Sequence, residues 1–198
     1  MTHQHPPTDR RRFLHHGARW AAATTAAAAT LGGLASASAQ AARAPAAVAP
    51  GARGLALAHT HTREQIALVY AHDDRYLPSA LGSLNHFLRD HYTGDVGQID
   101  PRLFDLLHRV RQVLGSTAEY EVISGYRCPT TNNRLRNTRG GGVAQRSLHM
   151  EGQAIDVRLR GVALADLRDA ALSLRAGGVG FYPRDQFVHL DTGRQRSW

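Results

Sequence analysis

Two short segments carry residues that could bind one metal ion together. The first contains His149, Gly152 and Asp156, and the second contains His189. Two histidine nitrogens and one carboxylate oxygen would close three sides of a tetrahedral zinc site and leave a fourth position for water. That ligand count is typical of catalytic rather than structural zinc, so the residues favour metal-assisted hydrolysis. The other interpretation is a buried histidine–aspartate pair without a metal.

The predicted strand 154–159 is suited to presenting the carboxylate. Alternate residues of a strand point to opposite faces of a sheet. Asp156 therefore lies on the face opposite Ile155, Val157 and Leu159. The apolar side chains can pack against helices while Asp156 faces a cleft.

The two histidines approach this strand from different segments. His149 lies in the loop before it, and Gly152 permits the turn between that histidine and the strand. His189 belongs to a second predicted strand, residues 187–190, which we expect to be a neighbour. Ligands held on rigid elements in this way can keep a fixed geometry.

The rest of the chain provides the scaffold. Alternating or continuous apolar patterns predict strands, and apolar residues spaced three and four apart after a capping residue predict helices. The predicted strands are 55–59, 65–70, 120–124, 154–159, 179–182 and 187–190. The predicted helices begin at Pro78, at Pro101 after the N-cap residue Asp100, after Thr131 and at Ala165. A leading hairpin, two helices and then a small, mostly antiparallel sheet with one more helix indicate an α+β domain.

Other histidines fit structural roles better than metal binding. His59 and His61 fall at the turn of the predicted hairpin. His86 and His91 lie off the apolar face of the first predicted helix, and we expect both to be solvated.

The N-terminal segment is typical of an export signal. Arginines at residues 10–12 precede a weakly apolar, Ala-rich segment that ends in a small-x-small sequence. This pattern predicts a twin-arginine signal peptide over residues 1–39, with a retained membrane anchor as the alternative. The Ala- and Pro-rich residues 40–53 predict a flexible linker, which leaves residues 54–198 for one domain.

The charge balance points away from nucleic acid. The chain of 198 residues has a formal charge of +8, but without residues 1–39 it carries 20 arginines against 15 acidic residues. These arginines are scattered rather than clustered, so we expect no nucleic-acid partner. A mildly basic surface suits an anionic cell-wall polymer. Cys128 is the only cysteine, which excludes an intramolecular disulfide.

Several motifs resemble one enzyme family. The pattern Ser-x-His-x-x-Gly-x-Ala-x-Asp at residues 147–156, followed by His189, resembles the M15 zinc peptidases, a group of D-Ala-D-Ala carboxypeptidases and endopeptidases. Residues 124–127 (SGYR), 177–183 (GGVGFYP) and 189–198 (HLDTGRQRSW) are similar to a narrower branch. That branch comprises the twin-arginine-exported murein endopeptidases of the YcbK type.

The resemblance covers residues 54–198 and implies both a fold and a site. The fold would be the compact one shared by these peptidases and the hedgehog signalling domain. One zinc ion would be bound by His149, Asp156 and His189. Arg127 would face the zinc and contact the scissile carbonyl or a substrate carboxylate, as a fixed guanidinium can. The family pattern also implies that three C-terminal residues form a wall of the cleft: Arg194, Arg196 and Trp198.

Hydrolysis also requires a group that accepts a proton from water and passes it to the leaving amine. Many relatives carry Glu or Asp three residues before the last histidine, but this chain has Gln186 there. Asp191 and Asp185 would both share the strand face of His189. We expect Asp191 to be the general base, with Asp185 as the alternative. The other role for Asp191 is to orient a ligand histidine through its second ring nitrogen.

The resemblance implies a zinc metallopeptidase of the cell envelope or periplasm that hydrolyses peptidoglycan cross-links. Stem peptides would be its partners, and it would meet the membrane only transiently through the signal peptide. Two other functions remain open: a D,D- or L,D-carboxypeptidase that trims stem peptides, and a non-catalytic, zinc-containing wall-binding module. An endopeptidase needs a cleft open on both sides, whereas a carboxypeptidase needs a closed end with a carboxylate-binding group.

Overall fold

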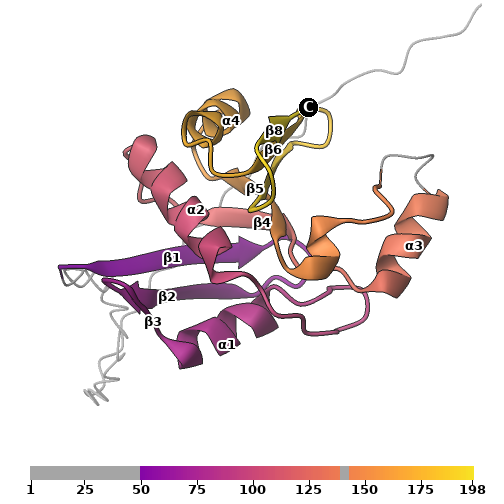
Figure 1. The fold of residues 1–198 in the computed structure, drawn as a ribbon, viewed down its shortest axis with the longest axis horizontal. Coiled ribbons are helices and arrows are strands. Elements are labelled where there is room, and N and C mark those ends of the chain that lie inside the picture. The colour runs from indigo at the N-terminus through magenta and orange to yellow at the C-terminus, as the bar shows by residue number, and fades with distance from the viewer. Residues whose placement is uncertain (1–49, 139–142) are drawn as a thin grey trace, which may run out of the picture. The chain divides into compact units, whose positions relative to one another are not determined.

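A single sheet of eight strands runs through the part of the chain that the computed structural model describes, residues 50–138 and 143–198 (Figure 1). Its strands are β1 (Ala52–His59), β2 (Gln65–His72), β3 (Arg75–Tyr76), β4 (Tyr120–Ser124), β5 (Ala154–Leu159), β6 (Gly178–Tyr182), β7 (Phe187–Asp191) and β8 (Arg196–Ser197). Their order across the sheet is β3-β2-β1-β4-β5-β7-β6-β8. Neighbouring strands are antiparallel except for the parallel pairs β1/β4 and β6/β8.

Helices cover this sheet and connect its strands. They are α1 (Pro78–Phe87), α2 (Pro101–Val113), α3 (Pro129–Thr138), α4 (Leu164–Ser173) and the short 3-10 helix η1 (Leu148–Glu151). The predicted α+β class is confirmed. None of the helices within the described residues is long and apolar enough to cross a membrane.

The predicted signal peptide, residues 1–39, and most of the predicted linker lie outside the described residues. Strand β1 begins at Ala52, so it includes the last two residues of the range predicted as linker, 40–53. The described residues fall in one compact unit, Pro45–Trp198.

The sheet is larger and more continuous than the sequence pattern suggests. The N-terminal hairpin joins the C-terminal strands through the parallel β1/β4 pair, in which Leu57 lies opposite Tyr120. A parallel pair needs a crossover connection, and here α1 and α2 lie in it between β2 and β4. Local patterns reveal strands but not such distant partners. Strands β3 and β8 contain two residues each, too few for a periodic pattern.

The hydrophobic core lies between the sheet and its helices. Helix α2 packs against β1 and α4, while α4 packs against β5, β6 and β7. Ile155, Val157 and Leu159 of β5 are buried in this core, as the alternation predicts. Asp156 consequently points to the other face of the sheet.

His91 differs from its prediction. It is half-buried rather than solvated, whereas His86 is exposed as expected. Its ring stacks on His61 with centroids 4.2 Å apart and lies 5.5 Å from the buried His59. The reason is that α1 ends at Phe87, so the helical spacing used to predict exposure no longer applies at residue 91.

Candidate metal centre

His149 is held by the short helix η1, which the sequence pattern predicts only as a loop. Gly152 ends this helix with a φ of 67°, a left-handed conformation that glycine adopts readily. A Cβ atom at this position would lie 1.9 Å from the carbonyl oxygen of Gln98. Both the backbone conformation and the close approach therefore require glycine at position 152, three residues after His149.

Asp156 and His189 face each other across two paired strands. They are direct partners in the antiparallel β5/β7 ladder. Directly opposite residues have their side chains on the same face of the sheet, so both point away from the core face that carries Ile155 and Leu190. The pairing confirms the prediction that these two strands are neighbours.

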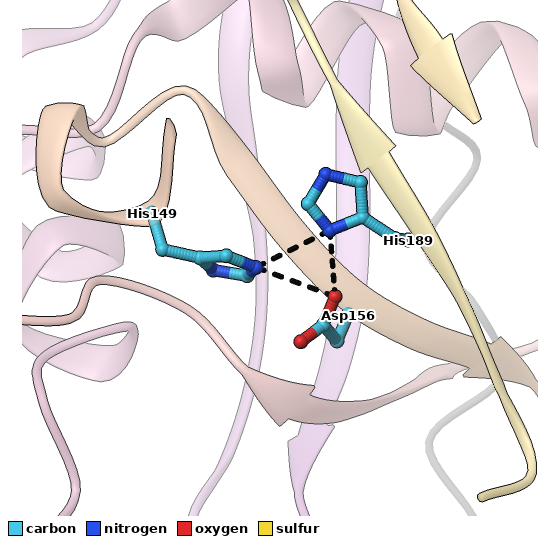
Figure 2. A group of neighbouring side chains, drawn as sticks. All are labelled: His149, Asp156 and His189. Carbon is cyan, nitrogen blue, oxygen red and sulfur yellow. Dashed lines mark hydrogen bonds and ion pairs between the residues drawn. The ribbon is translucent and has the colours of Figure 1, made fainter. Parts of the chain in front are cut away.

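The three side chains converge on one point (Figure 2). His189 Nδ1 lies 2.8 Å from Asp156 Oδ1, and His149 Nε2 lies 3.3 Å from both of these atoms. Across the described residues, this is the group of histidine, cysteine and acidic side chains whose donor atoms all lie within 4.8 Å of one another. The donor set of two imidazoles and one carboxylate matches three-ligand sites for zinc.

In both histidines, the ring nitrogen that points away from the site also has a hydrogen-bond partner. His149 Nδ1 lies 2.8 Å from the carbonyl oxygen of Gly125, and His189 Nε2 lies 3.1 Å from Asp191 Oδ2. An outer hydrogen bond of this kind fixes the tautomer and orientation of a metal-binding imidazole. The inner nitrogens are thereby left to point at the site, so the residues present fit a divalent metal ion.

The electrostatics also favour a cation here. Burial lowers the pKa of His149, with attraction to Asp156 opposing it. Burial alone would raise the pKa of Asp156, but its contacts with His149 and His189 hold that pKa well below its usual range. Burial opposes protonation of His189, yet its hydrogen bonds to Asp156 and Asp191 raise its pKa to about 9. Two carboxylates thus concentrate negative charge around this histidine.

Asp191 is fully buried, and its carboxylate is surrounded by donors. Oδ1 accepts hydrogen bonds from the backbone N–H groups of Gly178 and Gly193, at 3.0 and 2.9 Å. Arg196 donates to both oxygens, at 3.1 and 2.7 Å. With His189 as the further partner, every contact of this carboxylate holds it in place, which is compatible with the second of the two roles considered for Asp191, orienting a histidine.

Arg127 lies beside the ligand carboxylate. Its Nη2 atom is 3.8 Å from Asp156 Oδ2, and its backbone N–H donates to the carbonyl of His149 at 3.2 Å. The guanidinium also lies 3.4 Å from Ser124 Oγ and from Asn132 Oδ1. The loop after β4 therefore brings this arginine to the metal site.

A cavity of about 630 Å³ opens over the site. All three candidate ligands line it, together with Arg127, Asp185, Tyr182, Phe187, Arg196 and Trp198. Of the three residues predicted for the cleft wall, Arg196 and Trp198 line this cavity. Arg194 is exposed and is not among the lining residues. Trp198 Nε1 donates to the hydroxyl of Tyr182 at 2.7 Å, and its ring lies 5.3 Å from that of His189.

Three groups at the site are not predicted by the sequence pattern: Tyr182, Phe187 and the Gly125 carbonyl. Tyr182 and Phe187 flank the β6/β7 turn, and their rings stack at 4.6 Å on the cavity wall. The two residues are partners in the β6/β7 pair and lie at the ends of two predicted strands. Their contact could therefore have been predicted by pairing these strands as a hairpin. A backbone carbonyl carries no such signal.

Comparison with known proteins adds a consistent set of similarities. A family model described as peptidoglycan L,D-endopeptidase MepK (Peptidase_M15_2) matches residues 47–198. The peptidoglycan L,D-endopeptidase MepK of Escherichia coli K12 is 48% identical over 149 residues, which cover 75% of this chain and 81% of that protein. The probable peptidoglycan L,D-endopeptidase MepK of Haemophilus influenzae is 39% identical over 150 residues, covering 75% and 80%.

One solved structure is also similar. It is the crystal structure of the Serratia marcescens L-Ala D-Glu endopeptidase ChiX, at 17% identity and a TM-score of 0.33. The match covers 48% of this chain and 68% of that one.

Proposed function

The chain belongs to the Peptidase_M15_2 family, described as peptidoglycan L,D-endopeptidase MepK, and on that premise we propose that it is a zinc-dependent murein endopeptidase that hydrolyses peptide cross-links in peptidoglycan. The observation that carries this proposal is the convergence of His149, Asp156 and His189 at the floor of the large cavity. A substrate in that cavity would lie directly against the donor atoms. The names of the curated relatives favour endopeptidase action over stem trimming or wall binding.

One zinc ion is the cofactor we propose. Two imidazoles and one carboxylate suit zinc, and both imidazoles are oriented by a second hydrogen bond, as zinc-binding histidines usually are. When bound, such an ion polarises a peptide carbonyl and lowers the pKa of water towards neutrality.

We assign the proton transfer to Asp185. Of the two carboxylates considered for this role, Asp185 lines the cavity, whereas Asp191 is buried beneath His189. Asp185 would accept the proton of the attacking water and return it to the leaving amine. Asp191 would keep His189 in the orientation needed for binding.

Arg127 would stabilise the transition state. Its guanidinium lies next to the ligand Asp156 and reaches the same cavity. A cation fixed at this point can offset the negative charge that develops on the carbonyl oxygen during attack.

The place of action follows from the substrate. Peptidoglycan lies in the cell envelope, and the predicted twin-arginine signal at residues 1–39 would export the folded protein to the periplasm. The membrane would then be met only during export.

Ligand variants test this function. Asp156→Asn and His189→Gln should each bind zinc at least about 100-fold more weakly and lose cleavage of cross-linked muropeptides, because a three-ligand site cannot spare a donor. His86→Gln is the matched control, since His86 is exposed on α1. Zinc content and dimer cleavage are measured on the same samples. A ligand variant that keeps wild-type cleavage would refute the proposed centre.

A further inference from the structure

The aromatic wall of the large cavity carries a hydroxyl group whose hydrogen-bonding role is fixed by its neighbour. Trp198 Nε1 donates a hydrogen bond to the hydroxyl oxygen of Tyr182 at 2.7 Å. An indole nitrogen can only donate, so the phenol oxygen must be the acceptor in this pair. The proton of the phenol is therefore left for another acceptor, and no group of residues 50–138 and 143–198 accepts it.

The strand register places Tyr182 on the face of the sheet that carries the candidate ligands. In the β6/β7 ladder, Gly180 lies opposite His189 and Tyr182 lies opposite Phe187. Residues two apart on a strand share a face, so Tyr182 is on the same face as the His189 imidazole and about 7 Å further along the strand. Tyr182, Phe187 and His189 accordingly line the same cavity.

The contact with Trp198 brings the hydroxyl of Tyr182 back towards His189. The indole lies over Gly180, because a Cβ atom at that position would lie 2.7 to 2.9 Å from three atoms of the indole ring. One of these atoms is Nε1, which also contacts Tyr182. The phenol oxygen is thus held close to the Gly180/His189 pair rather than at the outer end of the hairpin.

The indole is itself held in place by its backbone and its ring. The carbonyl of Trp198 accepts a hydrogen bond from the N–H of Phe181 at 3.0 Å, and its N–H donates to the carbonyl of Val179 at 3.3 Å. The ring lies 5.3 Å from that of His189, and the guanidinium of Arg196 lies 4.8 Å from its centroid. A fixed donor therefore points at the hydroxyl of Tyr182.

We propose that Tyr182 is a substrate-binding residue whose hydroxyl donates a hydrogen bond to a carbonyl oxygen of the stem peptide in the large cavity, and that Trp198 is the positioning residue for this hydroxyl. The inference rests on the proposed function. The free proton of the phenol requires an acceptor, and carbonyl oxygens are the acceptors that recur along every peptide. Since Tyr182 stands one residue pair away from His189, the carbonyl it binds belongs to the peptide beside the bond that is cut.

The test removes the hydroxyl without changing the shape of the wall. Tyr182→Phe keeps the ring, which stacks on Phe187 with the centroids 4.6 Å apart. Tyr76→Phe is the matched control, because its hydroxyl also makes a hydrogen bond, to Asp105, but lies on β3 at the other end of the sheet order.

Trp198→Phe removes the indole donor, alone and in combination with Tyr182→Phe. Values of kcat and KM are measured on a cross-linked muropeptide dimer with zinc-loaded protein, and zinc affinity is measured by chelator competition.

Tyr182→Phe should raise KM about fivefold with a smaller change in kcat, because a neutral hydrogen bond to the bound substrate is lost. Its zinc affinity should equal that of the wild type, and Tyr76→Phe should keep the wild-type KM. In the Trp198→Phe background, replacement of Tyr182 should change KM by less than about twofold, because the hydroxyl no longer has a fixed direction and the two residues act as a unit.

An unchanged KM in Tyr182→Phe would overturn the binding role. A lower kcat at unchanged KM would overturn it as well, because the hydroxyl would then act on the reacting atoms. Equal effects of Tyr182→Phe in the wild-type and Trp198→Phe backgrounds would exclude the positioning role of Trp198. If the wild type cleaves no dimer, the proposed function itself fails, whereas cleavage that is insensitive to Tyr182→Phe removes the role of Tyr182 alone.

Discussion

At the scale of single residues, the proposed metal centre is supported by a chain of contacts behind His189. His189 is held by Asp191, Asp191 is held by Arg196, and the guanidinium of Arg196 lies 4.8 Å from the ring centroid of Trp198 on the cavity wall. Groups that orient a ligand typically change metal affinity by 10- to 100-fold when they are replaced. We therefore expect Asp191 to affect metal binding and Asp185 to affect proton transfer.

Replacement of each candidate base distinguishes these two roles. Asp191→Asn should weaken zinc binding about 10- to 100-fold, yet leave kcat near wild type once zinc is saturating. Asp185→Asn should leave zinc affinity unchanged and lower kcat by about 100-fold or more. Zinc affinity from chelator competition and kcat on a muropeptide dimer measure the two effects. Unchanged affinity with lost turnover in Asp191→Asn would restore Asp191 as the base.

We expect Arg196 to affect zinc binding indirectly, because it holds Asp191, which in turn holds His189. Its two bonds to Asp191, at 3.1 and 2.7 Å, need the planar fork of a guanidinium. Arg196→Lys should therefore weaken zinc binding by about tenfold. Arg194→Lys is the matched control, because Arg194 is exposed two residues earlier. The positioning role is excluded if the two variants bind zinc equally well.

At the scale of elements, local patterns predict the strands that carry the ligands. The alternation of β5 predicts that Asp156 faces away from Ile155 and Val157, and the structure agrees. The burial of Asp191 could not be predicted, because it depends on Arg196 in the two-residue strand β8. The neighbourhood of His61, His91 and Leu135 could not be predicted either, because these residues come together only through packing.

The contact between the end of β1 and the segment after α1 makes stability sensitive to acid. His59 is 2% exposed, and burial together with the neighbouring His91 and His61 lowers its pKa from 6.5 to about 4. Because the folded pKa lies below the unfolded one, the unfolded state binds the extra proton between these values. The stabilisation is complete above about pH 6.5 and is lost as pH falls towards 4, by up to about 3 kcal/mol.

Denaturant unfolding of the metal-free protein between pH 4 and 7 checks this effect. His59→Gln should flatten the loss of unfolding free energy over that range, because the titrating group has been removed. His86→Gln, at an exposed position of α1, should keep the wild-type slope. Identical slopes in all three proteins would show that burial of His59 does not drive acid sensitivity.

At the scale of the whole molecule, one compact unit brings together residues from both ends of the domain. The parallel β1/β4 pair attaches the N-terminal hairpin to β4, which in turn pairs with β5, the strand that carries Asp156.

The most direct measurement of the central proposal is hydrolysis of cross-linked muropeptide dimers by purified residues 40–198. Mass spectrometry follows the products with a chelator present and after zinc is restored. Conversion of dimers to monomers should stop on chelation and return with zinc. Conversion that continues in chelator would contradict the metal centre, loss of only a terminal residue would indicate a carboxypeptidase, and zinc binding without any product would indicate a wall-binding module.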